Sequence, residues 1–61
     1  MSALADQLDD LTTIVRQCDD KLAALNARHP YDVRSAAFYV ERKRRCETAM
    51  VDLKTQIALA A

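Results

Sequence analysis

The strongest concentration of side chains that could bind a partner lies at residues 38–45 of this 61-residue chain. Two aromatic residues, Phe38 and Tyr39, precede Glu41 and then four consecutive cations, Arg42–Arg45. Exposed aromatic rings beside arginines are the composition enriched in the hot spots of protein interfaces. The segment therefore predicts a partner-binding surface composed of Phe38, Tyr39, Arg42, Arg44 and Arg45.

The basic block allows two other interpretations. In the first, its cations pair with acids in an exposed salt-bridge face, where each pair stabilises the fold by only tenths of a kcal/mol. These acids would be Glu41 and Glu47, or the aspartates at 19–20 across a helical hairpin. Alternatively, residues 42–45 could bind nucleic acid phosphates. Nine Lys and Arg balance nine Asp and Glu, so no global field draws the chain to nucleic acid or to an anionic membrane. Nucleic acid is therefore the less favoured partner.

No other group of residues has a spacing typical of catalysis or metal binding. Adjacent aspartates point about 100° apart on a helix, and the serines and threonines lack a histidine at helical spacing. His29 is far in sequence from Cys18 and Cys46, and glycine is absent. We therefore expect no enzymatic activity, cofactor or metal. Neither a signal-peptide pattern nor a long apolar run is found, so a cytoplasmic location without membrane binding is expected.

Two apolar stripes with heptad spacing must position these side chains. They predict helices over about 3–28 and about 33–60, with Pro30 enforcing a turn at 29–32. Ser2 is the expected N-cap of the first helix, and Asp32 or Ser35 that of the second. The seam residues expected in the core are Leu4, Leu8, Leu11, Val15, Cys18, Leu22, Leu25, Cys46, Met50, Leu53 and Ile57.

Helices of similar length joined by a short turn predict an all-α fold, an antiparallel two-helix hairpin that forms one domain over 1–61. The favoured register sets Cys18 opposite Lys43 and Val15 opposite Cys46. A register shifted by about one turn would bring Cys18 level with Cys46, which leaves a disulfide open. Lys43 interrupts the second stripe, where it would either extend past its neighbours to solvent or fix the register of a dimer core.

A single hairpin leaves one side of each stripe exposed to water, which predicts dimerisation into a four-helix bundle. The flanking residues that would widen the apolar face toward a second copy are Ile14, Val33, Val40 and Ala49. We therefore expect a homodimer that contacts a host protein.

The segment 38–45 (FYVERKRR), within a short and neutral helical hairpin, resembles phage-encoded host-takeover proteins of the quorum-sensing anti-activator type. This resemblance implies a non-enzymatic inhibitor that covers a LuxR-type transcription regulator and blocks its access to DNA. The layout is also similar to the four-helix-bundle modulators of plasmid copy number, which bind RNA through their first helix. Five aspartates against three cations in residues 3–28 disfavour that role here. A structural coiled-coil adapter is the remaining alternative.

Overall fold

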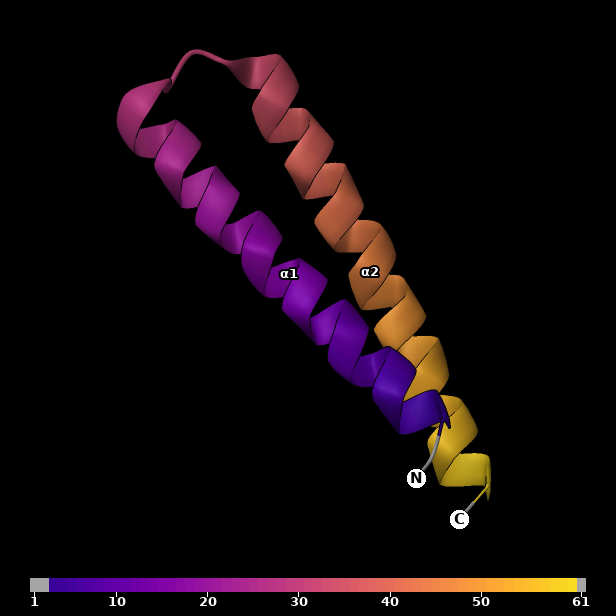
Figure 1. Ribbon diagram of the computed structural model, residues 1–61. Helices are drawn as coiled ribbons and strands as arrows, with labels where there is room; N and C mark the ends of the chain where they lie inside the picture. Colours follow the sequence, from indigo (N-terminus) through magenta and orange to yellow (C-terminus); the bar gives the residue numbers. More distant parts are fainter. Residues whose placement is uncertain (1–2, 61) are drawn as a thin grey trace.

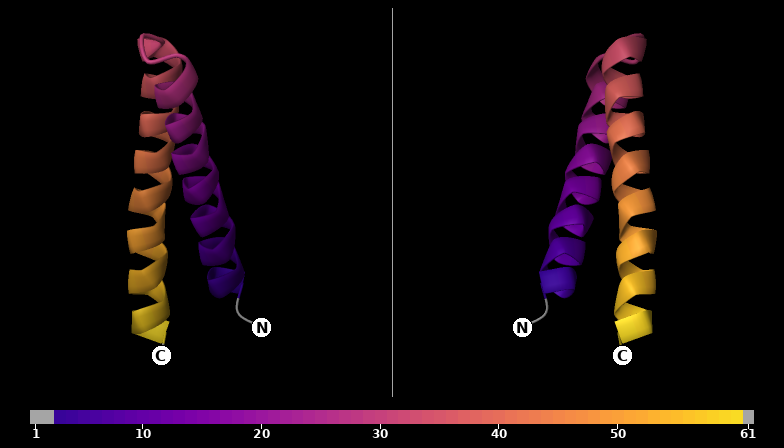
Figure 2. Two further views of the ribbon diagram at one scale, coloured as in Figure 1. Left: turned by 90° about the vertical axis from the view of Figure 1, so that its left-hand side faces the viewer. Right: turned by 90° about the vertical axis from the view of Figure 1, so that its right-hand side faces the viewer.

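The computed structural model describes residues 3–60, which form two helices, α1 (Ala3–Arg28) and α2 (Val33–Ala60). The helices run antiparallel and pack against each other, with the turn at one end of the molecule and both chain ends at the other (Figure 1). The prediction of an all-α helical hairpin is confirmed. The principal extents are 46 × 17 × 11 Å, so the molecule is a thin rod. Figure 2 shows that most of the outer surface of each helix is covered by no other element.

The bounds of α1 follow from charge and from the proline. An acidic residue in its first turn and a basic residue in its last turn both complement the helix dipole. The expected N-cap, Ser2, lies outside the described residues. At the other end, the N–H of His29 donates to the carbonyl of Leu25 at 2.7 Å, and Pro30 then prevents the helix from continuing.

Asp32 caps α2. Its Oδ1 accepts a hydrogen bond from the N–H of Ser35 at 3.1 Å, and its carbonyl accepts one from the N–H of Ala36 at 3.2 Å. The structure thus decides between the two expected caps, because Ser35 occupies the third helical position instead. Hydrogen bonds from the side chain and backbone of Ser35 hold the pKa of Asp32 below its usual value.

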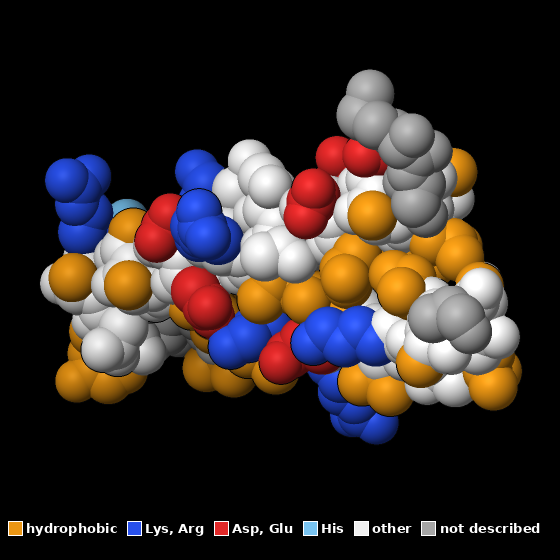
Figure 3. Space-filling model, turned by 90° about the horizontal axis from the view of Figure 1, so that it is seen from below, with side chains coloured by type: hydrophobic (Ala, Val, Ile, Leu, Met, Phe, Trp, Pro, Cys, Tyr) orange, Lys and Arg blue, Asp and Glu red, His pale blue; other side chains and the backbone are white. Residues whose placement is uncertain are grey.

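The core between the helices is narrow. Among residues 3–60, three side chains are buried, with exposed fractions of 3% for Cys18, 9% for Cys46 and 8% for Leu53. Both cysteines are free thiols. Figure 3 shows the band of hydrophobic side chains that runs between the helices. The other predicted seam residues are half-buried: Leu4, Leu8, Leu11, Val15, Leu22, Leu25, Met50 and Ile57.

An ion pair joins the two helices in the middle of the seam. The Nζ of Lys43 lies 2.7 Å from Oδ1 of Asp19, and the two side chains are 33% and 51% exposed. This contact agrees with the favoured register, which sets Lys43 opposite Cys18. Lys43 is therefore paired within one hairpin, as the salt-bridge interpretation of the basic block expects for one of its cations.

Within residues 3–60, neither helix contains a stretch that is both long and apolar enough to cross a lipid bilayer.

Candidate protein-binding surface

Phe38 lies on the outer face of α2 because its neighbour Tyr39 occupies the seam. Consecutive helical residues point about 100° apart, so an inward Tyr39 turns Phe38 away from α1. The Phe38 side chain is 59% exposed, whereas Tyr39 is half-buried. Their rings meet edge to face, with centroids 5.2 Å apart and planes at 82°. The Tyr39 ring thus supports a phenylalanine that the core does not enclose.

A shallow groove of ≈ 430 Å³ runs along this face of α2, lined by Phe38, Glu41, Arg42 and Arg45. These residues recur at steps of three and four, so successive turns of the helix bring their side chains together. Within the groove, Nε of Arg45 lies 3.4 Å from Oε1 of Glu41. The two side chains are 79% and 51% exposed, so solvent screens this pair and a partner could displace it easily.

Arg42 and Tyr39 also line a smaller hollow of ≈ 140 Å³ between the helices. Residues Ile14, Gln17 and Lys21 of α1 form its other wall. The surface that carries Phe38 therefore extends from α2 onto α1. The sequence patterns assign a contact only to Ile14 of this α1 wall, toward a second copy, and none toward a partner protein. The three-and-four spacing of the wall and its place opposite Tyr39 in the favoured register could have identified it.

The four cations of the basic block have different surroundings. Lys43 and Arg45 are engaged in ion pairs, and the hydrogen bond and charge of Asp19 raise the pKa of Lys43. Among residues 3–60, no salt bridge is formed by Arg42 or Arg44. Arg42 lines the groove, whereas Arg44 is exposed and lies outside it. The structure thus groups Phe38, Arg42 and Arg45 beside Tyr39 and separates Arg44 from them.

This surface combines several kinds of contact group. It offers an apolar ring, a guanidinium group with free donors and a half-buried tyrosine, and it is open to solvent along its length. In the described part of the chain, no three His, Cys, Asp or Glu side chains are close enough together to hold a metal ion. The groove has an aromatic side chain at Phe38 and a basic rim at Arg42 and Arg45, which is a composition enriched in interface hot spots.

Comparisons with known proteins identify no relative. No protein-family model, no curated protein and no solved structure matches the chain. The function must therefore be argued from the groove, the hollow beside it and the free faces of the hairpin.

Proposed function

We propose that this protein is a non-enzymatic binding module that inhibits a partner protein by covering part of the partner's surface. The contact surface consists of Phe38, Tyr39, Arg42 and Arg45. One observation carries the proposal: a 59% exposed phenylalanine lines the same groove as an arginine that has no salt bridge within the described chain. Apart from its edge contact with Tyr39, this ring lies largely in water and adds little to the narrow core.

The groove residues have the properties of an interface anchor. Removing the exposed part of Phe38 from water would contribute on the order of 1–2 kcal/mol to binding. The free guanidinium group of Arg42 can form a bidentate pair with a carboxylate, which adds orientation as well as energy. The support of Tyr39 lowers the entropy lost on binding, because a packed ring is already partly ordered.

The kind of partner follows from the resemblance of residues 38–45 to anti-activators. A hairpin of 61 residues with no net charge and an aromatic and basic second helix supports the same role here. We propose a LuxR-type transcription regulator as the partner, with the groove covering a surface that the regulator needs for access to DNA. No chemical step is involved, so occupancy alone sets the degree of inhibition.

The proposed working form is a homodimer that forms a four-helix bundle. Three buried side chains between two long helices give a thin core, while valines at 33, 40 and 51 stay more than half exposed. Helical hairpins usually complete such a core by packing against a second hairpin. A second copy is the simplest source of the missing apolar surface.

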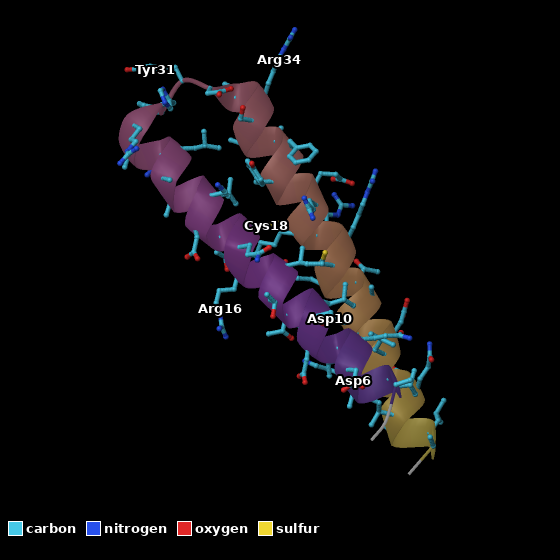
Figure 4. All side chains as sticks on the ribbon, viewed as in Figure 1. Asp6, Asp10, Arg16, Cys18, Tyr31 and Arg34 are labelled. Carbon is cyan, nitrogen blue, oxygen red and sulfur yellow. The ribbon has the colours of Figure 1, made fainter. Side chains whose placement is uncertain are left out.

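Capture from host lysate tests the contact surface. The baits are the wild-type protein, a Tyr39→Ala/Arg42→Ala variant and a matched Tyr31→Ala/Arg34→Ala variant, each used with and without nuclease. The control removes the same residue types from the turn end, where Tyr31 and Arg34 are exposed to solvent (Figure 4). Circular dichroism establishes that each bait is folded.

We expect one protein to be retained by the wild type and the control, and lost by the Tyr39→Ala/Arg42→Ala variant. If all three baits retain the same proteins, the groove is not the contact surface and an adapter role gains support. Retention that nuclease abolishes would favour nucleic acid binding, which should also weaken steeply between about 50 and about 200 mM salt. An interface centred on Phe38 should change little over that range.

A further inference from the structure

A second stripe of exposed residues runs along α2, beside the seam and on the side away from the groove, and its end at Val33 lines a hollow that α1 also borders. Its apolar members include Val33, Val40 and Val51, which are 73%, 54% and 62% exposed. Its members recur at steps of three and four, so they share one helical face. We name it the valine stripe, and it comprises Val33, Ala37, Val40, Arg44, Glu47, Val51, Lys54 and Ala58, all of them exposed.

We propose that the valine stripe is the surface on which a second copy of this chain docks, with the two α2 helices antiparallel. This inference rests on the proposed homodimer and assigns its face and its register. Val40 of each copy lies opposite Val51 of the other. The contact is isologous, so every pair occurs twice about the twofold axis.

The charged members of the valine stripe support this register. Once Val40 is set opposite Val51, Arg44 falls opposite Glu47 of the second copy without any further choice. The two-fold axis repeats this opposite-charge pair, and such pairs fix register and orientation in helical interfaces. At the ends of the stripe, Val33 falls opposite Ala58, so an apolar pair closes each end.

The remaining pair in this register sets Ala37 opposite Lys54. The small alanine leaves room for the aliphatic stem of the lysine, whose ammonium group can extend to solvent at the rim. The charge of Lys54 therefore stays in contact with water.

Other arrangements of the same two stripes pair these residues poorly. A parallel arrangement would set Arg44 against Arg44 and Glu47 against Glu47, and like charges in contact cost stability. Sliding one antiparallel copy by one heptad step sets Arg44 opposite Val40 in one direction and opposite Lys54 in the other. The Val40–Val51 register is thus the one that sets Val40 against Val51 and Arg44 against Glu47, with Lys54 facing only a small alanine.

The proposed dimer leaves the groove free. Arg44 and Arg42 are two residues apart, so their side chains point about 200° apart around α2. The second copy therefore covers the side of α2 opposite to the groove, and both grooves of the dimer face outward. Dimerisation and partner binding are then compatible.

Charge exchange between the two stripes tests this assignment. The dimer dissociation constant is measured by sedimentation equilibrium for the wild type, Arg44→Glu, Glu47→Arg and the double variant with both changes. Each single change sets two like-charge pairs face to face, so we expect each to weaken the dimer about tenfold or more. The double variant restores opposite charges, so its dissociation constant should return to within about threefold of the wild type.

A matched control is Arg42→Glu, which makes the same charge change on the other side of α2 and should leave the dissociation constant unchanged. If Arg42→Glu weakens the dimer while Arg44→Glu does not, the copies meet through the groove side and the valine stripe assignment is wrong. Failure of the double variant to recover overturns the register. A wild type that stays monomeric to about 1 mM overturns the homodimer itself. If a charge variant loses helicity in circular dichroism, Val51→Ala takes its place in the test. This change keeps the helix, and it must weaken the dimer if the valine stripe is the contact surface.

Discussion

Two leucines near the end of α2 show how unequal the contributions of single residues are in so thin a molecule. Leu53 is 8% exposed and is one of the three buried side chains in the described part of the chain, whereas Leu59 is 82% exposed. Both residues are leucines on the same helix, six positions apart in sequence. Substitutions at these two positions therefore show how much contact with α1 contributes to the free energy of unfolding.

Leu53→Ala should lower the free energy of unfolding by about 2–5 kcal/mol, because it removes buried methyl groups and leaves a cavity. A loss of that size is a large part of the stability of any small domain, so the variant should be largely unfolded at 37 °C. The matched Leu59→Ala change should stay within about 0.5 kcal/mol of the wild type. Urea unfolding followed by circular dichroism measures both. Equal losses at the two positions would contradict the packing described for α2.

The residue scale also shows what the sequence could and could not predict about the site. The three-and-four spacing of Phe38, Arg42 and Arg45 predicts that they share a face, and the structure places them in one groove. Glu41 and the aspartates at 19–20 are acids expected to pair with the basic block, and Glu41 and Asp19 do so. Which cations stay without a salt bridge could not be predicted, since this depends on which acid reaches which cation. Asp19 reaches Lys43 across the hairpin, and this requires the register as well as the spacing.

At the scale of the elements, the boundary of α2 rests on one carboxylate. Asp32→Ala removes the acceptor for the N–H of Ser35 and should lower the melting temperature by several degrees at neutral pH. Asp32→Asn keeps an acceptor oxygen and should lose much less. Thermal unfolding at pH 7 gives the melting temperatures of the wild type and both variants. A smaller decrease for Asp32→Ala than for Asp32→Asn would contradict the capping role.

The same carboxylate should make the stability of the hairpin depend on pH. The pKa of Asp32 lies below its usual value of 3.8 in the folded state, so the folded state binds this proton less readily than the unfolded state. The stabilisation is therefore complete above pH 3.8 and is lost as the pH falls through the folded-state pKa. The melting temperature of the wild type should therefore lie above that of Asp32→Asn by a margin that shrinks as the pH falls from about 5 to about 2. A difference that does not change with pH would contradict it.

Both helices and the turn could be predicted because their signals are strong and independent. Heptad spacing over about seven turns leaves little choice of structure, and Pro30 marks where the first helix must end. The choice of cap could not be made in advance, since Asp32 and Ser35 are both good capping residues. What decides it is the path of the chain between the helices, and this depends on how the two seams pack.

At the scale of the whole molecule, the hairpin has more apolar seam than one copy can cover. If a second copy supplies the missing surface, the melting temperature must depend on protein concentration through mass action. We expect it to rise by several degrees between about 5 and about 500 µM, as measured by circular dichroism in short and long cells. A melting temperature that is constant over this range would show that the folded unit is a single hairpin.

The short turn also determines the order in which the seam can assemble. Leu25 and Ala36, which line one hollow beside the turn, close a loop of about ten residues, whereas Leu4 and its expected neighbour Ile57 close one of about fifty. Closing the longer loop first would cost more chain entropy, by about 0.6 kcal/mol for each doubling of length. Folding should therefore begin at the turn and proceed along the seam toward the chain ends, and such local contacts are typical of helical proteins that fold in microseconds to milliseconds.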